Sequence, residues 1–148
     1  MTRENVVDLS EGDGGNSKVQ DLKRRCEMVR KIQPDCVLSI HQNSYPEEAI
    51  HGAQVFYYED SSEGKKLAEI LQKHLVEVLD KENHRQAKGN RTYYMLKKTE
   101  ATLVIVECGF LSNNQEALLL TDEKYQNKVA KAICSGTLEY LSSLAEKK

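Results

Sequence analysis

Two polar residues, His41 and Glu107, each follow directly after a short apolar segment of the sequence. These segments, residues 36–40 and 102–106, are of the kind that forms strands buried in a sheet. In open sheets ligands collect at the carboxyl ends of the strands, which is where both residues are expected. A neutral imidazole there could hold a metal ion, and a nearby carboxylate could take a proton from metal-bound water. The pair could therefore form half of a hydrolytic zinc site.

The spacing alone leaves a purely structural explanation open. His41 could simply hydrogen-bond a loop carbonyl, and Glu107 could cap a helix or pair with a lysine. The other histidines, His51, His74 and His84, fall in a loop, a long predicted helix and a charged loop. We expect these three at the surface rather than as metal ligands.

Cysteine chemistry is the other catalytic possibility in this sequence. No HExxH, P-loop, GxSxG or glycine-rich dinucleotide motif is present. Cys108 could serve as a nucleophile if His41 lies across the strand ends, but its apolar neighbours favour an inert thiol. The cysteines are well separated and form no CxxC pair, so we expect four buried thiols: Cys26, Cys36, Cys108 and Cys134.

The composition describes one globular domain over residues 1–148. The chain is 39% hydrophobic and 30% charged, with a formal net charge of -2. A chain of this length buries roughly 68–70% of its unfolded surface, which is enough for a core without disulfides. No apolar run approaches the roughly 20 residues needed to cross a bilayer, and no apolar leader follows Met1. The balanced charge also argues against a nucleic-acid-binding protein.

Strands and helices alternate in the pattern of apolar residues. Residues 1–16 are expected to form a polar loop, and Ser17 with Gln20 forms a capping box at the start of a helix. The most apolar and β-branched segment, 102–106, is placed at the centre of the sheet. This order predicts an α/β layered fold with a largely parallel sheet. The predicted elements are a helix at 17–32, strands at 36–40 and 53–58, a helix at 61–82, a loop at 83–90, a strand at 102–106, and helices at 114–120 and 122–144.

Three segments carry a family resemblance: LSIHQN at 38–43, GAQVFYY at 52–58 and VECGFLSN at 106–113. In type, order and spacing they resemble the zinc-dependent N-acetylmuramoyl-L-alanine amidases, which cut bacterial peptidoglycan. The likeness runs from Met1 to Tyr140 and so covers nearly the whole chain. Residues 21–25 and the aromatic run 56–58 look most like the germination-specific branch that acts on spore cortex.

The resemblance implies a three-layer αβα domain with a largely parallel or mixed sheet. It also implies one zinc ion held by two histidines and a glutamate, with a second glutamate as general base. By motif, His41 looks like the later histidine ligand and Glu107 like the catalytic glutamate. Glu107 would then deprotonate zinc-bound water, which attacks the amide between N-acetylmuramic acid and L-alanine, and would pass the proton to the leaving amine. The implied partner is peptidoglycan, and the implied location is extracytoplasmic, in the cell wall or spore envelope.

The sequence departs from the family pattern at its beginning. It contains neither the Gly-His-Gly-Gly-type motif that supplies the first histidine nor the glutamate that follows it. We therefore expect a partial, N-terminally truncated catalytic domain in which two zinc ligands are absent and zinc binding is weak or lost. Glu4, Glu47, Glu48 or His51 could substitute, but nothing in their spacing favours them. A sheet that lacks strands would expose an edge and invite self-association or a partner protein.

Three interpretations remain at this point. The chain could be part of a zinc amidase whose activity belongs to the intact domain. It could instead be a metal-free, non-catalytic relative that binds cell-wall glycopeptide or a partner in a groove beside His41, Gln42 and Asn43. The presence of Glu107 counts against this second interpretation, because a protein that only binds has no need of a base. The third is an unrelated α/β protein in which the motifs serve packing.

Overall fold

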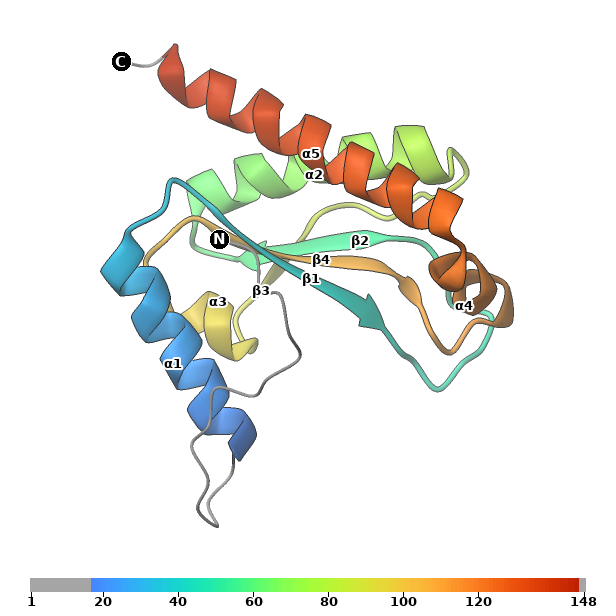
Figure 1. Ribbon diagram of the computed structural model, residues 1–148, viewed down its shortest axis with the longest axis horizontal. Helices are drawn as coiled ribbons and strands as arrows, with labels where there is room; N and C mark the ends of the chain where they lie inside the picture. The colour runs from blue at the N-terminus through green and yellow to red at the C-terminus, as the bar shows by residue number, and fades with distance from the viewer. Residues whose placement is uncertain (1–16, 147–148) are drawn as a thin grey trace.

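The computed structural model describes residues 17–146. Its helices sandwich a sheet in three layers: α2 and α5 cover one face, and α1 and α3 lie against the other (Figure 1). The predicted loop at 1–16, the capping-box side chain of Ser17 and the candidate ligand Glu4 lie outside the described residues. The elements are α1 (Ser17–Ile32), β1 (Val37–Asn43), β2 (Gln54–Tyr58), α2 (Ser62–Leu79), β3 (Lys88–Asn90), α3 (Tyr94–Lys98), β4 (Leu103–Phe110), α4 (Asn114–Thr121) and α5 (Glu123–Ala145).

The sheet is mixed, with the strand order β1-β4-β2-β3. β1 runs parallel to β4 and β3 runs parallel to β2, whereas β2 and β4 are antiparallel. No helix connects β1 to β2, so the chain does not return to the end of the sheet where β1 began, and β2 runs in the opposite direction. β4 lies inside the sheet, as the apolar pattern of residues 102–106 predicts. The α/β class is confirmed.

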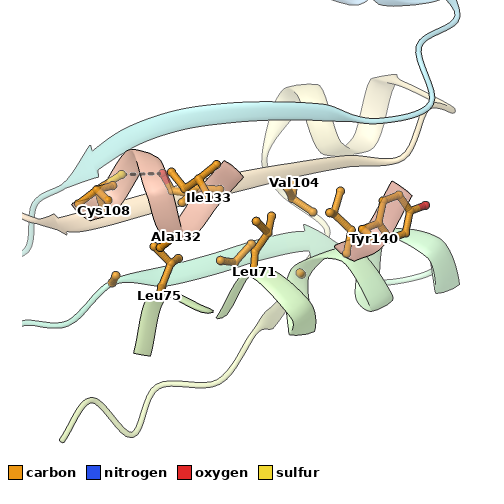
Figure 2. Close-up of a cluster of buried hydrophobic side chains, with 13 residues drawn as sticks. Leu71, Leu75, Val104, Cys108, Ala132, Ile133 and Tyr140 are labelled. Atoms are coloured by element: carbon orange, nitrogen blue, oxygen red, sulfur yellow. Dashed lines mark hydrogen bonds between the residues drawn. The ribbon is translucent and has the colours of Figure 1, made fainter. Parts of the chain in front are cut away.

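The main core lies between the sheet and the α2–α5 layer (Figure 2). Val104 and Val106 of β4 are fully buried there against Leu71 of α2, and each such side chain contributes about 1.5–3 kcal/mol. α5 approaches α2 closely at Gly136, where an added Cβ would lie 3.0 Å from Leu71 Cδ2. This packing fixes the sheet against its longest helices.

A smaller core on the opposite face consists of Cys26, Phe56, Met95, Leu96 and Leu103. It holds α1 and α3 against the sheet. The Phe56 ring meets the Tyr93 ring edge to face, with centroids 5.5 Å apart.

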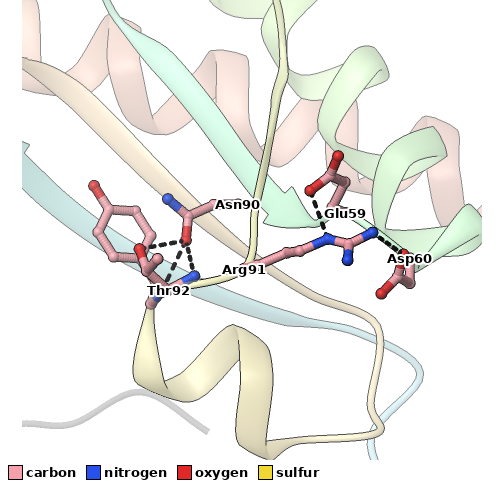
Figure 3. A network of polar contacts seen from close by, with 6 residues as sticks. Glu59, Asp60, Asn90, Arg91 and Thr92 are labelled. Carbon is pink, nitrogen blue, oxygen red and sulfur yellow. Dashed lines mark hydrogen bonds and ion pairs between the residues drawn. The ribbon is translucent and has the colours of Figure 1, made fainter.

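The segment before α3 is shaped by local hydrogen bonds that the apolar pattern did not reveal (Figure 3). Asn90 Oδ1 accepts hydrogen bonds from the backbone N–H groups of Thr92 (2.7 Å) and Tyr93 (2.8 Å). Arg91 pairs with Glu59 at 2.7 Å and with Asp60 at 2.8 Å. Part of the predicted 83–90 loop is therefore β3, and α3 follows it.

β1 differs from its prediction in burial and in length. We expected residues 36–40 to be buried on both faces, but the strand is only half-buried and the Ile40 side chain is 55% exposed. Among residues 17–146 β1 pairs with β4 alone, so the packing that encloses the central strand does not enclose this one. The parallel ladder also continues past residue 40 and past residue 106, so His41 and Glu107 lie within their strands rather than after them.

No helix in the described part of the chain is both long enough and apolar enough to cross a membrane.

Candidate active site

His41 and Glu107 are direct neighbours in the sheet. β1 and β4 run parallel, and the register places His41 opposite Glu107. Side chains at matching positions of adjacent strands point to the same face of the sheet. Glu107 lies on the same face of β4 as Leu103 and Ile105, which contact the α1–α3 core, so this is the face that carries the pair. The structure thus brings together the two residues that the sequence singled out.

Glu107 is a buried carboxylate with one unpaired oxygen. The residue is only 8% exposed, and burial raises its pKa because the charged form loses hydration. Its Oε2 atom is buried without a hydrogen-bond partner among residues 17–146. A carboxylate in this state is a stronger base than one in water, and it has a free lone pair to accept a proton.

His41 lies exposed on β1, and its surroundings favour the neutral imidazole. Burial lowers its pKa, and the positive charge of Arg25 on α1 lowers it further. Its Nε2 atom lies 2.8 Å from Ser39 Oγ, two residues earlier on the same face of β1. Within the described chain Nδ1 has no hydrogen-bond partner. A neutral ring with one nitrogen oriented by a neighbour and the other free is the form in which histidine binds metals.

A carboxylate from α4 fixes the chain just beyond Glu107. The β1–β4 register shifts after His41, so that Asn43 pairs with Phe110 across a bulge. Glu116 accepts a hydrogen bond from Phe110 N (2.8 Å) and another from Gly52 N (3.0 Å). These two bonds tie the end of β4 to the loop that enters β2. The motif at 106–113 did not indicate this role, because Glu116 lies outside it.

The β2 side of the site consists of residues that sequence reasoning did not identify. Gln54 pairs in register with Glu107 from the antiparallel neighbour β2. The Tyr93 ring meets Phe56 of β2, and its pKa is raised by burial and then by the charge of Glu107. Ser39 could have been found from the two-residue period of a strand. Gln54 and Tyr93 depend on strand pairing that one sequence does not reveal.

Cys108 faces away from this site. It lies in the α2–α5 core, where burial and then the Glu107 charge raise its pKa to about 11. It therefore stays a protonated thiol near neutral pH, in agreement with the inert thiol that its neighbours predict. Cys26 is buried and Cys36 half-buried, but Cys134 is exposed, so the prediction of four buried thiols is wrong there. On α5 the inward position belongs to Ile133, and the next residue is rotated away from the sheet.

The remaining histidines do not join the site. His51 and His84 are exposed. His74 is half-buried on α2, where its Nε2 lies 2.7 Å from Glu139 Oε2 on α5. Residues 17–146 contain no group of three or more His, Cys, Asp or Glu side chains arranged to hold a metal ion, so Glu47, Glu48 and His51 do not assemble around His41. The described residues supply two groups that part of a zinc site could use: the neutral nitrogen of His41 and the basic carboxylate of Glu107.

Comparison with known proteins identifies the family. The model of the N-acetylmuramoyl-L-alanine amidase family matches residues 1–139. The germination-specific N-acetylmuramoyl-L-alanine amidase of Bacillus subtilis is 38% identical over 145 residues, which are 96% of this chain. This chain spans 61% of the length of that relative.

Solved structures agree with the sequence matches. The CwlD amidase of Clostridioides difficile, solved in complex with the GerS lipoprotein, superposes with a TM-score of 0.91 at 37% identity. That match covers 95% of this chain and 74% of the other. An N-acetylmuramoyl-L-alanine amidase of Clostridium difficile 630 gives a TM-score of 0.77 at 30% identity, covering 82% of this chain and 66% of the other. The resemblance inferred from three motifs is confirmed, and the chain belongs to the N-acetylmuramoyl-L-alanine amidase family.

Proposed function

We propose that the protein hydrolyses the amide between N-acetylmuramic acid and L-alanine in peptidoglycan, with Glu107 as general base and His41 as a zinc ligand. The observation that carries the proposal is the register pairing of His41 with Glu107 on one face of the sheet. The family supports the reaction class, and the names of the relatives support the substrate.

Zinc fits the part of the site that the described residues supply. His41 offers a neutral nitrogen, which is a preferred zinc ligand. When bound, the ion would polarise the amide carbonyl and acidify a water molecule. His41 would hold the metal, and Ser39 would orient the ring through Nε2.

Glu107 would move the proton. Its unpaired Oε2 accepts a proton from the attacking water, and the same oxygen then donates it to the nitrogen of the leaving L-alanine. The raised pKa helps the first transfer, because a more basic carboxylate takes the proton more readily, and the protonated carboxyl then gives it to the nitrogen as the C–N bond breaks. Partial burial between the neighbouring strands also limits competing water.

The proposed place of action is the bacterial cell wall or the spore envelope. Relatives include a germination-specific amidase and the LytC amidase of Bacillus subtilis, which is 30% identical over 130 residues. The branch that acts during germination is the one we propose for this chain, since that relative matches 96% of it.

A protein contact at the β1 edge is also part of the proposal. Among residues 17–146 β1 has a neighbour on one side only, and Ile40 beside that edge is 55% exposed. The CwlD relative was solved with a protein partner, which supports this kind of assembly.

Sedimentation tests self-pairing through this edge. We expect the chain to sediment above its monomer mass, and Ile40→Lys to shift it towards the monomer. Leu138→Lys, at a 59% exposed position on α5, should leave the distribution unchanged. A chain that is monomeric without any substitution would contradict self-pairing.

The reaction is tested by the chemistry of the product. Because the match covers 61% of the Bacillus subtilis relative, the chain is assayed after joining it to the part of that relative outside the match. With zinc supplied, purified peptidoglycan should yield new N-terminal L-alanine. Glu107→Gln should lower the rate by roughly 10²–10⁴-fold, the usual contribution of a general base. Glu139→Gln, a change of the same type on the outer face of α5, should retain the rate. Equal rates for the first variant and the parent, or no release of L-alanine by the parent, would contradict the proposal.

A further inference from the structure

Arg85 is held rigidly at three points beside the site. Its Nε donates a hydrogen bond to the His51 carbonyl at 2.7 Å, and its Nη1 donates to Gln54 Oε1 at 3.1 Å. Its Cζ lies 4.9 Å from the centroid of the Phe110 ring, so the guanidinium also makes a cation–π contact. The stretch that enters β2 and the end of β4 therefore together fix one long side chain.

The charge of Arg85 is not neutralised by the partners that hold it. Arg25 pairs with Asp21 at 2.6 Å, and Arg91 pairs with Glu59 and Asp60 at 2.7 and 2.8 Å. The partners of Arg85 are a carbonyl, an amide oxygen and an aromatic ring. Within residues 17–146 it forms no ion pair, and its remaining N–H groups have no partner. The structure thus keeps a full positive charge with free donors in a fixed orientation.

The strand pairing shows where Arg85 lies relative to Glu107. Gln54, which holds the guanidinium, is the register partner of Glu107 on β2. Phe110, on which the guanidinium lies, follows Glu107 in β4. Adjacent strands are about 4.8 Å apart, so Arg85 is held by a residue of the strand next to Glu107 and by the ring at the end of the strand that carries Glu107. A substrate group one residue away from an amide bond cleaved at Glu107 could therefore reach the Arg85 guanidinium.

We propose that Arg85 binds the α-carboxylate of the glutamate that follows L-alanine in the stem peptide. This inference rests on the proposed function, because it places the scissile amide at Glu107. The planar guanidinium fork matches a carboxylate, and its fixed orientation reduces the entropy lost when the substrate binds. Arg85 would therefore distinguish stem peptides that carry a free α-carboxylate from those in which this group is an amide.

The experiment compares two dipeptide probes that differ at this one group. N-acetylmuramoyl-L-alanyl-D-glutamate has the free α-carboxylate, and N-acetylmuramoyl-L-alanyl-D-isoglutamine has an amide in its place. Both keep the side-chain carboxylate, so their difference isolates the α-carboxylate. Affinities are measured by calorimetry on the chain carrying Glu107→Gln, which prevents hydrolysis during the titration.

We expect the acid to bind roughly fivefold more tightly than the amide, as for a partly exposed ion pair. Arg85→Gln should reduce this ratio to about one, and Arg85→Lys should keep part of it because the charge remains. Arg91→Gln, which removes an arginine already paired with carboxylates, should leave the ratio unchanged. Circular dichroism melting verifies that each variant is folded. If Arg85→Gln does not fold, Arg85→Lys serves in its place, and an unchanged ratio of the two affinities in that variant would overturn the inference.

Equal affinities for the two probes in the parent, or a ratio that survives Arg85→Gln, would overturn the inference while leaving the proposed function intact. Binding of neither probe would contradict the proposed function and this inference with it.

Discussion

Burial shifts the pKa of both Glu107 and His41, and both shifts suit the roles proposed for these residues. Desolvation raises the pKa of the Glu107 carboxyl and lowers that of the His41 imidazole, because it disfavours the charged form of each group. The result is a stronger base beside a neutral ring. Buried charge costs stability, however, and Glu107 has no described partner for Oε2 that would offset the cost.

This cost predicts that Glu107→Gln raises the free energy of unfolding by an amount that depends on pH. The folded pKa lies above the unfolded value, so ionisation destabilises the parent as pH rises through the folded pKa. The variant has no charge to bury. It should be more stable than the parent at neutral pH, and the difference should vanish below the pKa of the unfolded carboxyl, in urea unfolding at each pH.

Glu139→Gln provides a control in which the stability should change in the opposite direction. The hydrogen bond with His74 lowers the Glu139 pKa, so the parent gains stability above the unfolded pKa and loses it as pH falls. Replacing Glu139 should therefore weaken the fold at neutral pH rather than strengthen it. A stability difference for Glu107→Gln that does not change with pH would contradict the burial of an ionised carboxylate.

The cysteines predict a clear order of chemical reactivity. Cys134 is exposed, whereas burial raises the pKa of Cys108 to about 11. A maleimide should therefore label Cys134 first in the folded chain and should reach Cys108 only after unfolding. Mass spectrometry of the labelled peptides provides the measurement. Rapid labelling of Cys108 in the folded protein would contradict this prediction and make Cys108 a candidate nucleophile again.

At the scale of elements, the long periodic segments were predictable from sequence and the short ones were not. α1, α2 and α5 follow from apolar positions at helical spacing, and β4 follows from its β-branched run. β3 and α3 depend on hydrogen bonds to Asn90 and on contacts with distant strands, which leave no periodic signal. The burial of β1 was misjudged because an apolar run does not reveal how many neighbours a strand has.

The same limit applies to the site. His41 and Glu107 were visible because each is a polar residue at the end of an apolar run. Their contact depends on β1 and β4 being adjacent, which the sequence alone did not establish. Arg85 hydrogen-bonds residues more than thirty positions away, and one of the two Glu116 hydrogen bonds reaches Gly52 from a distant part of the chain, so neither role could be inferred from local pattern.

The turn before β2 requires a glycine at position 52, and a substitution there tests this requirement. Gly52 has φ +99°, and an added Cβ would lie 2.7 Å from Asn83 Oδ1. The Asn83 side chain also donates to the Ala53 carbonyl at 2.9 Å, so it cannot easily move away. Gly52→Ala should cost about 1–3 kcal/mol in the free energy of unfolding, measured in urea.

Gly89→Ala is the matched control for this substitution. There the backbone does not have a positive φ, and the nearest atom to an added Cβ is the Cγ of the exposed Glu59 side chain, at 3.0 Å. Equal losses of stability for the two alanine variants would show that the turn does not require a glycine at position 52.

At the scale of the molecule, the two helical layers cover the sheet unequally. The α2–α5 layer buries the larger core, and the α1–α3 layer forms the smaller one (Figure 1). His41 and Glu107 lie on the face of the smaller layer, towards the carboxyl ends of β1 and β4. The larger core can therefore stabilise the fold, while the smaller layer carries the candidate site.

The family relation bears on the roles of His41 and Glu107. The chain matches the amidase family over residues 1–139 and spans 61% of its Bacillus subtilis relative. Within the described part, His41 and Glu107 have distinct proposed roles, one in holding zinc and one in moving a proton. Those roles separate in experiment, because loss of a ligand removes the metal whereas loss of a base leaves it bound.

Zinc content is the most direct test of this division. The chain joined to the remaining part of the Bacillus subtilis relative is dialysed against a weak chelator, and zinc per chain is measured by elemental analysis. We predict that the parent and Glu107→Gln retain equal zinc while His41→Ala loses most of it. Full zinc in His41→Ala, or loss of zinc in Glu107→Gln, would contradict the assignment of ligand and base.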